Sequence, residues 1–333
     1  MLFLDRHAAG LQVLARPRFL HADGGPAIRL DGNAAWAILP EAVGSYRAGS
    51  YAGGVLFLGG AGSVEAYPLT TAGVGAKMDE VTGLPAFLGF NRSHIEVAAS
   101  GTVVAVCNGD GYAAGVPWDG SDFGTPMVAP VAATAMRLFP TGDMVLLRIG
   151  LVAQIRGWDD VTGFGAVLPA GATGGGFGGA PQTAIDVTAG AFLCLSGTSL
   201  RMAFEVDPVG GVGAAYTLPA SLTGLLVRAV RFSPAGNRLA VLSAWPNALR
   251  VYEWDDTTGF GAEVVAAVPP VGSITTSVIE WAPAGDAIFV SRAALGAGDS
   301  LAVVAYPYGA TLGAPVVATT LSDGVEYLIV GAF

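Results

Sequence analysis

The stretch Leu226–Ala267, LVRAVRFSPAGNRLAVLSAWPNALRVYEWDDTTGFGAEVVAA, decides the fold. Apolar and polar residues alternate in four short segments, which is typical of half-buried β-strands. Turn-forming residues separate the segments. In Ser233–Gly236 (SPAG) the proline suits the second position of a type I turn and the glycine suits the fourth. Four short antiparallel strands cannot bury both faces alone, so the stretch predicts a unit that stacks on copies of itself.

The copies are centred on the turn after the third strand. Trp254–Gly261 (WDDTTGFG) matches Trp158–Gly165 (WDDVTGFG), and Trp118–Gly124 (WDGSDFG) is shorter by one residue. More degenerate copies are Pro68–Gly75 (PLTTAGVG), Val206–Gly213 (VDPVGGVG) and Pro307–Gly313 (PYGATLG). The mean spacing of the six copies is about 48 residues, which is the length of a four-stranded propeller blade.

This period predicts an all-β, seven-bladed β-propeller of four-stranded antiparallel blades in a single domain, residues 1–333. Residues 1–33 and 325–333 look like two parts of one blade. We expect the ring to be closed by N- and C-terminal strands that share this composite blade. Its expected strands, in order from the innermost, are Val325–Val330, Leu2–Leu4, Leu11–Leu14 and Ala27–Leu30. The 49 glycines and 20 prolines suit a fold with many tight turns.

The charge and hydropathy of the chain exclude some classes of partner. The net charge is −10 and Lys77 is the only lysine, so the basic patch of a nucleic-acid-binding protein is not expected. Membrane insertion is not expected either, because no stretch of 18 residues is free of charged and strongly polar residues. Residues 1–6 do not resemble a secretory signal. Only 13% of residues are charged, which favours burial of the surface in a larger assembly.

Few residues suggest chemistry. The pairs Asp159-Asp160 and Asp255-Asp256 are typical of turns, because aspartate bonds its own backbone two residues on; calcium binding at a blade corner is the alternative. Gly174, Gly176 and Gly179 match G-x-G-x-x-G, but we expect a loop between blades here rather than the strand and helix of a dinucleotide site.

The cysteines and histidines complete this inventory. Cys107 and Cys194 lie on expected strands of separate blades and are predicted to be free thiols. The three histidines are His7, His21 and His94, and no pair of them has the spacing of a metal site. We therefore predict no catalytic residue, no cofactor and no metal.

Aromatic residues recur at equivalent positions. Trp118, Trp158 and Trp254 begin three copies of the turn, and recurrence favours packing, although a ring of sugar-stacking sites is the sharper alternative. Phe123, Phe164 and Phe260 precede a glycine in the same copies and are predicted to pack between blades. Val74, Val212 and Leu312 are their smaller counterparts in the degenerate copies.

The order FSPAGNRLAV and then LRVYEWDDTTGFGA resembles WD-repeat-like bacterial propeller repeats, and more closely the propeller repeats of tailed-bacteriophage virion proteins. The similarity covers about residues 55–320. It implies a non-enzymatic structural or attachment component of a phage tail, fibre or head, made in the host cytoplasm and located in the virion. Its partners would be other virion proteins.

Two other functions stay open. One is a module that binds a host glycan or receptor through the loops of one propeller face. The other is a propeller hydrolase with a metal in the central channel, although three scattered histidines count against it.

Overall fold

In the computed structural model, the described residues are 2–6, 11–15, 48–60, 62–70, 73–87, 93–173, 184–196, 200–244, 247–267, 279–282, 285–291, 301–309, 311–313, 316–321 and 328–332. The chain divides into two compact units, one from Met1–Phe90 with Pro270–Phe333 and one from Asn91–Pro269. Among the described residues, no helix has the length and apolar character needed to cross a membrane.

The unit Asn91–Pro269 contains four antiparallel four-stranded blades, which we name A to D. Blade A is β8 (His94–Val97), β9 (Val103–Cys107), β10 (Ala113–Pro117) and β11 (Met127–Val128). Blade B is β12 (Ala135–Leu138), β13 (Met144–Ile149), β14 (Val152–Asp159) and β15 (Gly163–Thr173). Blade C is β16 (Ile185–Val187), β17 (Ala191–Ser196), β18 (Leu200–Asp207) and β19 (Gly211–Ala215). The short 3-10 helix η3 (Ala220–Leu222) precedes blade D, which is β20 (Val227–Phe232), β21 (Arg238–Ala244), β22 (Asn247–Asp255) and β23 (Gly259–Ala267).

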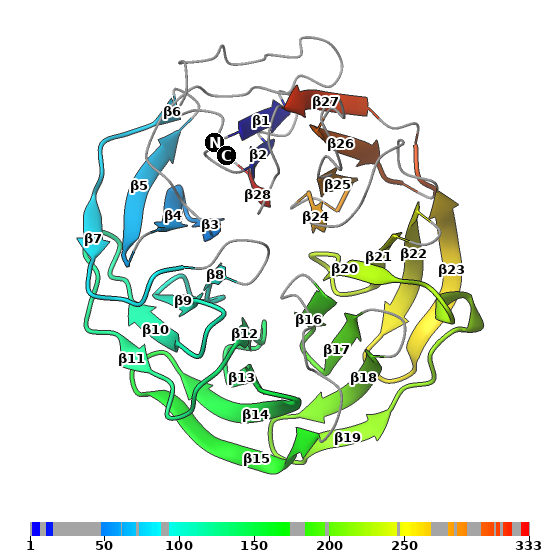
Figure 1. Ribbon diagram of the computed structural model, residues 1–333, viewed down its shortest axis with the longest axis horizontal. Coiled ribbons are helices and arrows are strands. Elements are labelled where there is room, and N and C mark those ends of the chain that lie inside the picture. The colour runs from blue at the N-terminus through cyan, green and yellow to red at the C-terminus, as the bar shows by residue number, and fades with distance from the viewer. Residues whose placement is uncertain are drawn as a thin grey trace. The chain divides into compact units, whose positions relative to one another are not determined.

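The first strands β8, β12, β16 and β20 lie next to one another along the inner edge of this unit, and we call them inner strands (Figure 1). Turn chemistry brings each second strand back along its inner strand. In blade D the Gly236 N–H donates to Ser233 O at 2.8 Å, and Gly236 has φ of 69°, which glycine adopts without strain. Equivalent bonds join Gly142 to Phe139 in blade B and Gly285 to Ala282 in the other unit.

The second unit contains two further blades and one smaller sheet. Blade E is β24 (Ile279–Trp281), β25 (Ala287–Ser291), β26 (Leu301–Pro307) and β27 (Val316–Leu321). Blade F is β3 (Ala48–Ala52), β4 (Val55–Gly59), β5 (Val64–Thr70), β6 (Gly73–Val74) and β7 (Asp79–Val81). In blade F, β6 pairs with one end of β5 and β7 with the other, so two short strands share the fourth place.

The prediction of seven four-stranded blades is wrong: the described residues form six blades, five with four strands and blade F with two short strands in the fourth place. The ends of the chain pair in one sheet, as expected, but within the described residues that sheet holds three strands: β1 (Leu2–Arg6), β2 (Leu11–Ala15) and β28 (Leu328–Ala332). The predicted number of seven came from the repeat period and treated this terminal sheet as a complete four-stranded blade. The expected fourth strand, Ala27–Leu30, lies outside the described residues.

The order of the terminal sheet also differs from the prediction. β28 pairs with β2 and not with β1, so the order is β1-β2-β28. The sequence of β1 ends in Asp5-Arg6, and charged residues suit an edge strand better than a central strand. The middle strand, LQVLA, carries no charge.

The core of the unit Asn91–Pro269 lies between successive blades. Three apolar clusters fill the junctions A–B, B–C and C–D. Each cluster takes residues from the two sheets that flank it, so at each of these three junctions two neighbouring blades bury one face against each other. This explains why the sequence repeats at blade length.

Candidate functional site

The recurring tryptophans and phenylalanines form pairs inside blades A, B and D. Trp118, Trp158 and Trp254 are 5%, 5% and 4% exposed. Trp158 lies opposite Phe164 and Trp254 opposite Phe260, with ring centroids 5.0 Å apart in both pairs. Trp118 and Phe123 form the same pair at 4.8 Å. The phenylalanines keep intermediate exposure. Because the indole faces are buried, these tryptophans do not offer the open platform that stacking on a sugar needs.

The two residues of each Asp pair have separate roles. Asp159 Oδ1 accepts the N–H groups of Val161 and Thr162 at 3.0 and 2.7 Å, and Asp255 Oδ1 accepts those of Thr257 and Thr258, both at 2.9 Å. These bonds lower the pKa of both carboxyl groups. The first aspartate of each pair therefore forms the turn.

The second aspartate of each pair joins its blade to the preceding one. Trp158 Nε1 donates to Asp160 Oδ1 at 2.7 Å, and Thr102 of blade A donates to Asp160 Oδ2 at 3.3 Å. In blade D, Trp254 Nε1 donates to Asp256 Oδ1 at 2.7 Å. From blade C, the Gly190 N–H donates to Asp256 Oδ2 at 3.0 Å and the Thr188 hydroxyl to Asp256 Oδ1. We call these two arrangements the Asp160 latch and the Asp256 latch.

A second set of charged residues lies on the inner strands. Each inner strand of blades A to D carries an ionised residue one position before its last residue: Glu96 in A, Arg137 in B, Asp186 in C and Arg231 in D. Their signs alternate along the unit. Blade D carries a second arginine, Arg228, on the same strand. Arg137 and Asp186 are buried, with 4% and 6% exposure.

The carboxylates among them bond to the next blade. Glu96 Oε2 accepts the Leu138 N–H of blade B at 3.1 Å. Asp186 Oδ2 accepts the Phe232 N–H of blade D at 2.7 Å, and Arg231 lies 3.3 Å from its other oxygen. Both carboxylates therefore hold the backbone of the neighbouring inner strand in place.

Burial and charge set the protonation of this inner-strand cluster. Burial and the nearby charge of Arg137 lower the pKa of His94 from 6.5 to about 4, so the ring is neutral at pH 7. Burial alone would raise the pKa of Glu96, but the contact with His94 and the charges of Arg137 and Arg231 outweigh it and bring the pKa to about 2. Burial raises the pKa of Asp186, and Arg231 and Arg137 offset only part of that rise.

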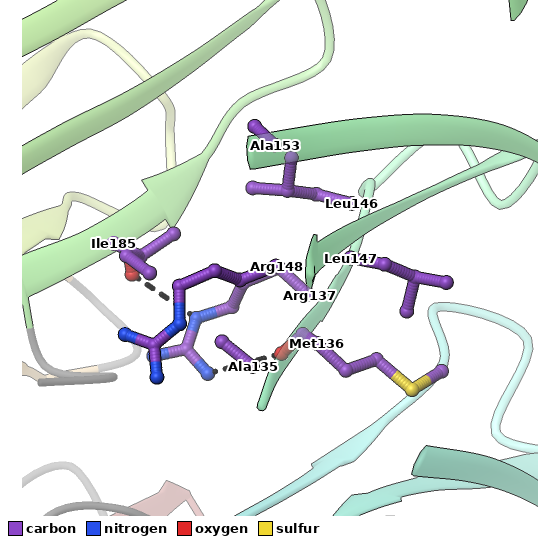
Figure 2. Close-up of a pocket in the computed structure, with 8 residues that line it drawn as sticks. All are labelled: Ala135, Met136, Arg137, Leu146, Leu147, Arg148, Ala153 and Ile185. Atoms are coloured by element: carbon purple, nitrogen blue, oxygen red, sulfur yellow. Dashed lines mark hydrogen bonds between the residues drawn. The ribbon is translucent and has the colours of Figure 1, made fainter. Parts of the chain in front are cut away.

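At the junction between blades B and C the contact is different. Arg137 Nε donates to Ile185 O of blade C at 3.1 Å. A small pocket lies beside this bond, mainly within blade B, and Figure 2 shows Arg137 and Arg148 among its lining residues. Its other lining residues are Ala135, Met136, Leu146, Leu147, Ala153 and Ile185. The space is too narrow to hold a water molecule.

The remaining candidates lie apart from this cluster. His7, His21 and Gly174–Gly179 lie outside the described residues. Cys107 and Cys194 are buried free thiols, and burial raises the pKa of Cys194 to about 12. Within the described part of the chain, no group of three or more His, Cys, Asp or Glu side chains has the arrangement of a metal site.

Sequence reasoning missed the inner-strand charges and the latches. An isolated Glu, Arg or Asp in HIEV, AMRL, IDV or VRAVRF looks like an ordinary solvent-facing position of a short strand. The alternation of sign from blade to blade was the available signal, and it needed the blade boundaries first.

Comparison with known proteins agrees on the fold. No protein-family model matches this chain, and neither does any curated protein sequence. A solved periplasmic gluconolactonase of Pseudomonas aeruginosa, PpgL, is 14% identical, with a TM-score of 0.67 over 99% of both chains. The β-propeller domain of Cps50 (Swd1) from Myceliophteria thermophila is also 14% identical, with a TM-score of 0.57 over 88% of this chain and 93% of that one.

A third solved structure, hydrazine synthase of Kuenenia stuttgartiensis, is 13% identical, with a TM-score of 0.52 over 78% of this chain and 76% of that one. At these identities the similarity shows the fold alone. The fold is an all-β propeller whose described residues form six antiparallel blades, and WD40-like propellers are among its structural neighbours.

Proposed function

We propose that this propeller is a non-enzymatic scaffold that binds other proteins. The observation that carries the proposal is the use of the inner-strand charges. The carboxylates of Glu96 and Asp186 bond to the backbone of the next blade, and Arg137 bonds to Ile185 O. These are the groups that a channel enzyme would need for acid–base chemistry, and here they stabilise contacts between blades.

The surface supports the same proposal. Val161 and Val209 occupy equivalent turns of blades B and C and are 85% and 84% exposed. Apolar side chains at the tips of rigid turns are suited to contact with a protein partner. The low charge of the chain points the same way.

The assembly that we propose is a tailed-phage particle, with other virion proteins as partners and the virion as the location. This part rests on the resemblance of the repeats to phage propeller repeats. Mass spectrometry of purified particles from the phage that encodes the chain tests it. We expect a fixed copy number per particle, and absence of the chain from the particles would contradict the assignment.

The competing proposal is an enzyme, because a gluconolactonase shares the fold over 99% of both chains. Hydrolysis of gluconolactone by the purified chain, compared with Glu96→Gln and Asp186→Asn variants, separates the two. We expect no turnover above the uncatalysed rate. Turnover that disappears in the variants while their melting temperatures stay near that of the parent would overturn the scaffold proposal.

A glycan-binding module is the other alternative, and the buried indole rings leave its contacts to the loops. A sugar array probed with the purified chain tests it. Saturable binding to one glycan would favour host attachment over a purely structural role.

A further inference from the structure

The three junctions between blades A, B, C and D are of two kinds. At A–B and at C–D, an inner-strand carboxylate accepts a backbone N–H from the following blade. At the same two junctions, the Asp160 or Asp256 latch reaches back to the first turn of the preceding blade. Each of these junctions therefore has an inner and an outer polar attachment.

The middle junction B–C has different residues at both latch positions. One backbone hydrogen bond is repeated in every blade of this unit and shows which positions are equivalent. In blades A to D in turn, it runs from Trp118 N–H to Thr102 O (2.7 Å), from Trp158 N–H to Asp143 O (2.8 Å), from Val206 N–H to Gly190 O (2.7 Å) and from Trp254 N–H to Asn237 O (3.1 Å). By this alignment Pro208 takes the place of the latch aspartate. Asp143 takes the place of Thr102 and Gly190, which receive the latch at the other junctions.

These replacements prevent a latch between blades B and C. Proline has no carboxylate to accept a bond. A carboxylate at Asp143 would repel an aspartate brought toward it from blade C. The inner attachment is also different, since it is the bond from Arg137 to Ile185 O.

The aromatic packing also differs at this junction. Trp158 belongs to the apolar cluster between A and B, and Trp254 to the cluster between C and D. In the cluster between B and C the equivalent residue is Val206. The pocket beside Arg137 and Arg148 is lined by blade B and, from blade C, by Ile185 (Figure 2). The smaller Val206 side chain makes fewer dispersion contacts at this position than a tryptophan does.

We propose that this unit is built of two rigid blade pairs, A with B and C with D, and that it opens first at the seam between B and C. Local opening of a folded protein starts where the stabilising interactions are weakest, and this is the one of the three described junctions without a latch. Opening here would break the bond from Arg137 to Ile185 O and uncover the buried Arg137 side chain.

The two cysteines report on the two kinds of junction. Cys107 lies in the cluster between A and B, and Cys194 in the cluster between B and C. Both are 0% exposed, so a thiol reagent reaches them only when the surrounding structure opens. Labelling with N-ethylmaleimide in native buffer, followed by peptide mass spectrometry, gives one rate for each. We expect Cys194 to react at least about tenfold faster than Cys107, after correction for the rates in denaturant. Equal rates, or faster labelling of Cys107, would overturn the proposal.

Matched variants test the latch itself. Asp160→Ala removes the A–B latch and should speed labelling of Cys107 by about tenfold while leaving Cys194 unchanged. Asp159→Ala is the control, because it removes only bonds within the turn of blade B and should leave the ratio of the two rates as in the parent. An unchanged Cys107 rate in Asp160→Ala would count against the latch.

The reverse experiment builds a latch at the seam. Asp143→Thr with Pro208→Asp restores the residue types found at the A–B junction, and should slow labelling of Cys194 without slowing that of Cys107. Equal slowing of both thiols would show general stabilisation and refute a seam. If this double variant does not fold, the Asp160→Ala and Asp159→Ala pair decides between the same outcomes.

Discussion

Gly115 of blade A lies against the indole ring of Trp158 in blade B, and this contact gives a sharp test of the packing between blades. A Cβ atom added at Gly115 would be 2.3 Å from Trp158 Cη2 and 2.9 Å from Cζ2. Ordinary contact between carbon atoms begins near 3.5 Å, so the ring would have to withdraw by about 1 Å. The ring is 5% exposed, and its Nε1 is held by Asp160 at 2.7 Å. It therefore has little freedom to move.

We expect Gly115→Ala to lower the free energy of unfolding by about 2–4 kcal/mol, because overpacking of a rigid core is costly. The control is Gly157→Ala, where the nearest atom to the added Cβ is 3.9 Å away, and where we expect a change of at most about 1 kcal/mol. Urea denaturation of both variants measures the difference.

A double-mutant cycle shows whether the clash is the cause. Trp158→Phe gives up the indole N–H and part of the ring, and should itself cost about 1–3 kcal/mol. It also vacates the space that the new methyl group needs. We expect the combined variant to be more stable than the sum of the two single changes by about 1 kcal/mol or more. Strict additivity, or a Gly115→Ala variant as stable as the parent, would refute the reasoning.

Three further outcomes follow from other contacts. The pKa of His94 is lowered to about 4, so the folded state disfavours the protonated ring. We therefore expect the free energy of unfolding to fall on the order of 3 kcal/mol as pH drops from about 6.5 to 4, and His94→Gln to lose that dependence in urea titrations at several pH values. Phe260→Ala should cost about 2 kcal/mol in the same assay, less than the 3–5 kcal/mol typical of a fully buried ring, because Phe260 keeps intermediate exposure; no measurable loss would contradict its packing on Trp254. Deleting residues 328–333 removes β28, the partner of β2, and should lower the melting temperature by several degrees, whereas an unchanged melting temperature would mean that the terminal sheet contributes little.

Local features of the fold could be predicted from the sequence. The SPAG turn and the four strands around it follow from residue types a few positions apart. The number of blades could not, because it depends on how two distant ends of the chain pair. The pairing of β28 with β2 rather than with β1 joins residues more than 300 positions apart, and neither period nor turn chemistry specifies that choice.

The Asp pairs show where sequence reasoning about the candidate site stops. The role of Asp159 follows from its turn alone, since all its bonding partners lie within three residues. The role of Asp160 requires Thr102, which lies 58 residues earlier in another blade. The same limit applies to Glu96 and Leu138, which are 42 residues apart. Contacts between blades define the inner-strand cluster, and a strand read by itself does not contain them.

The seam between blades B and C nevertheless has a trace in the sequence. The two nearly identical copies, Trp158–Gly165 and Trp254–Gly261, are two blades apart, and both lie in the later blade of a latched pair. The copies in blades A and C, at Trp118 and Val206, have Gly120 and Pro208 where the latch aspartate stands. A requirement for packing alone would act on every blade equally. The second aspartate is present in blades B and D and absent from blades A and C, as expected if the structural repeat is a pair of blades. The inner-strand charges alternate in sign with the same two-blade period. The same alternation therefore appears at the outer turns and at the inner strands, and two separate sets of contacts support the blade pair as the structural repeat of this unit.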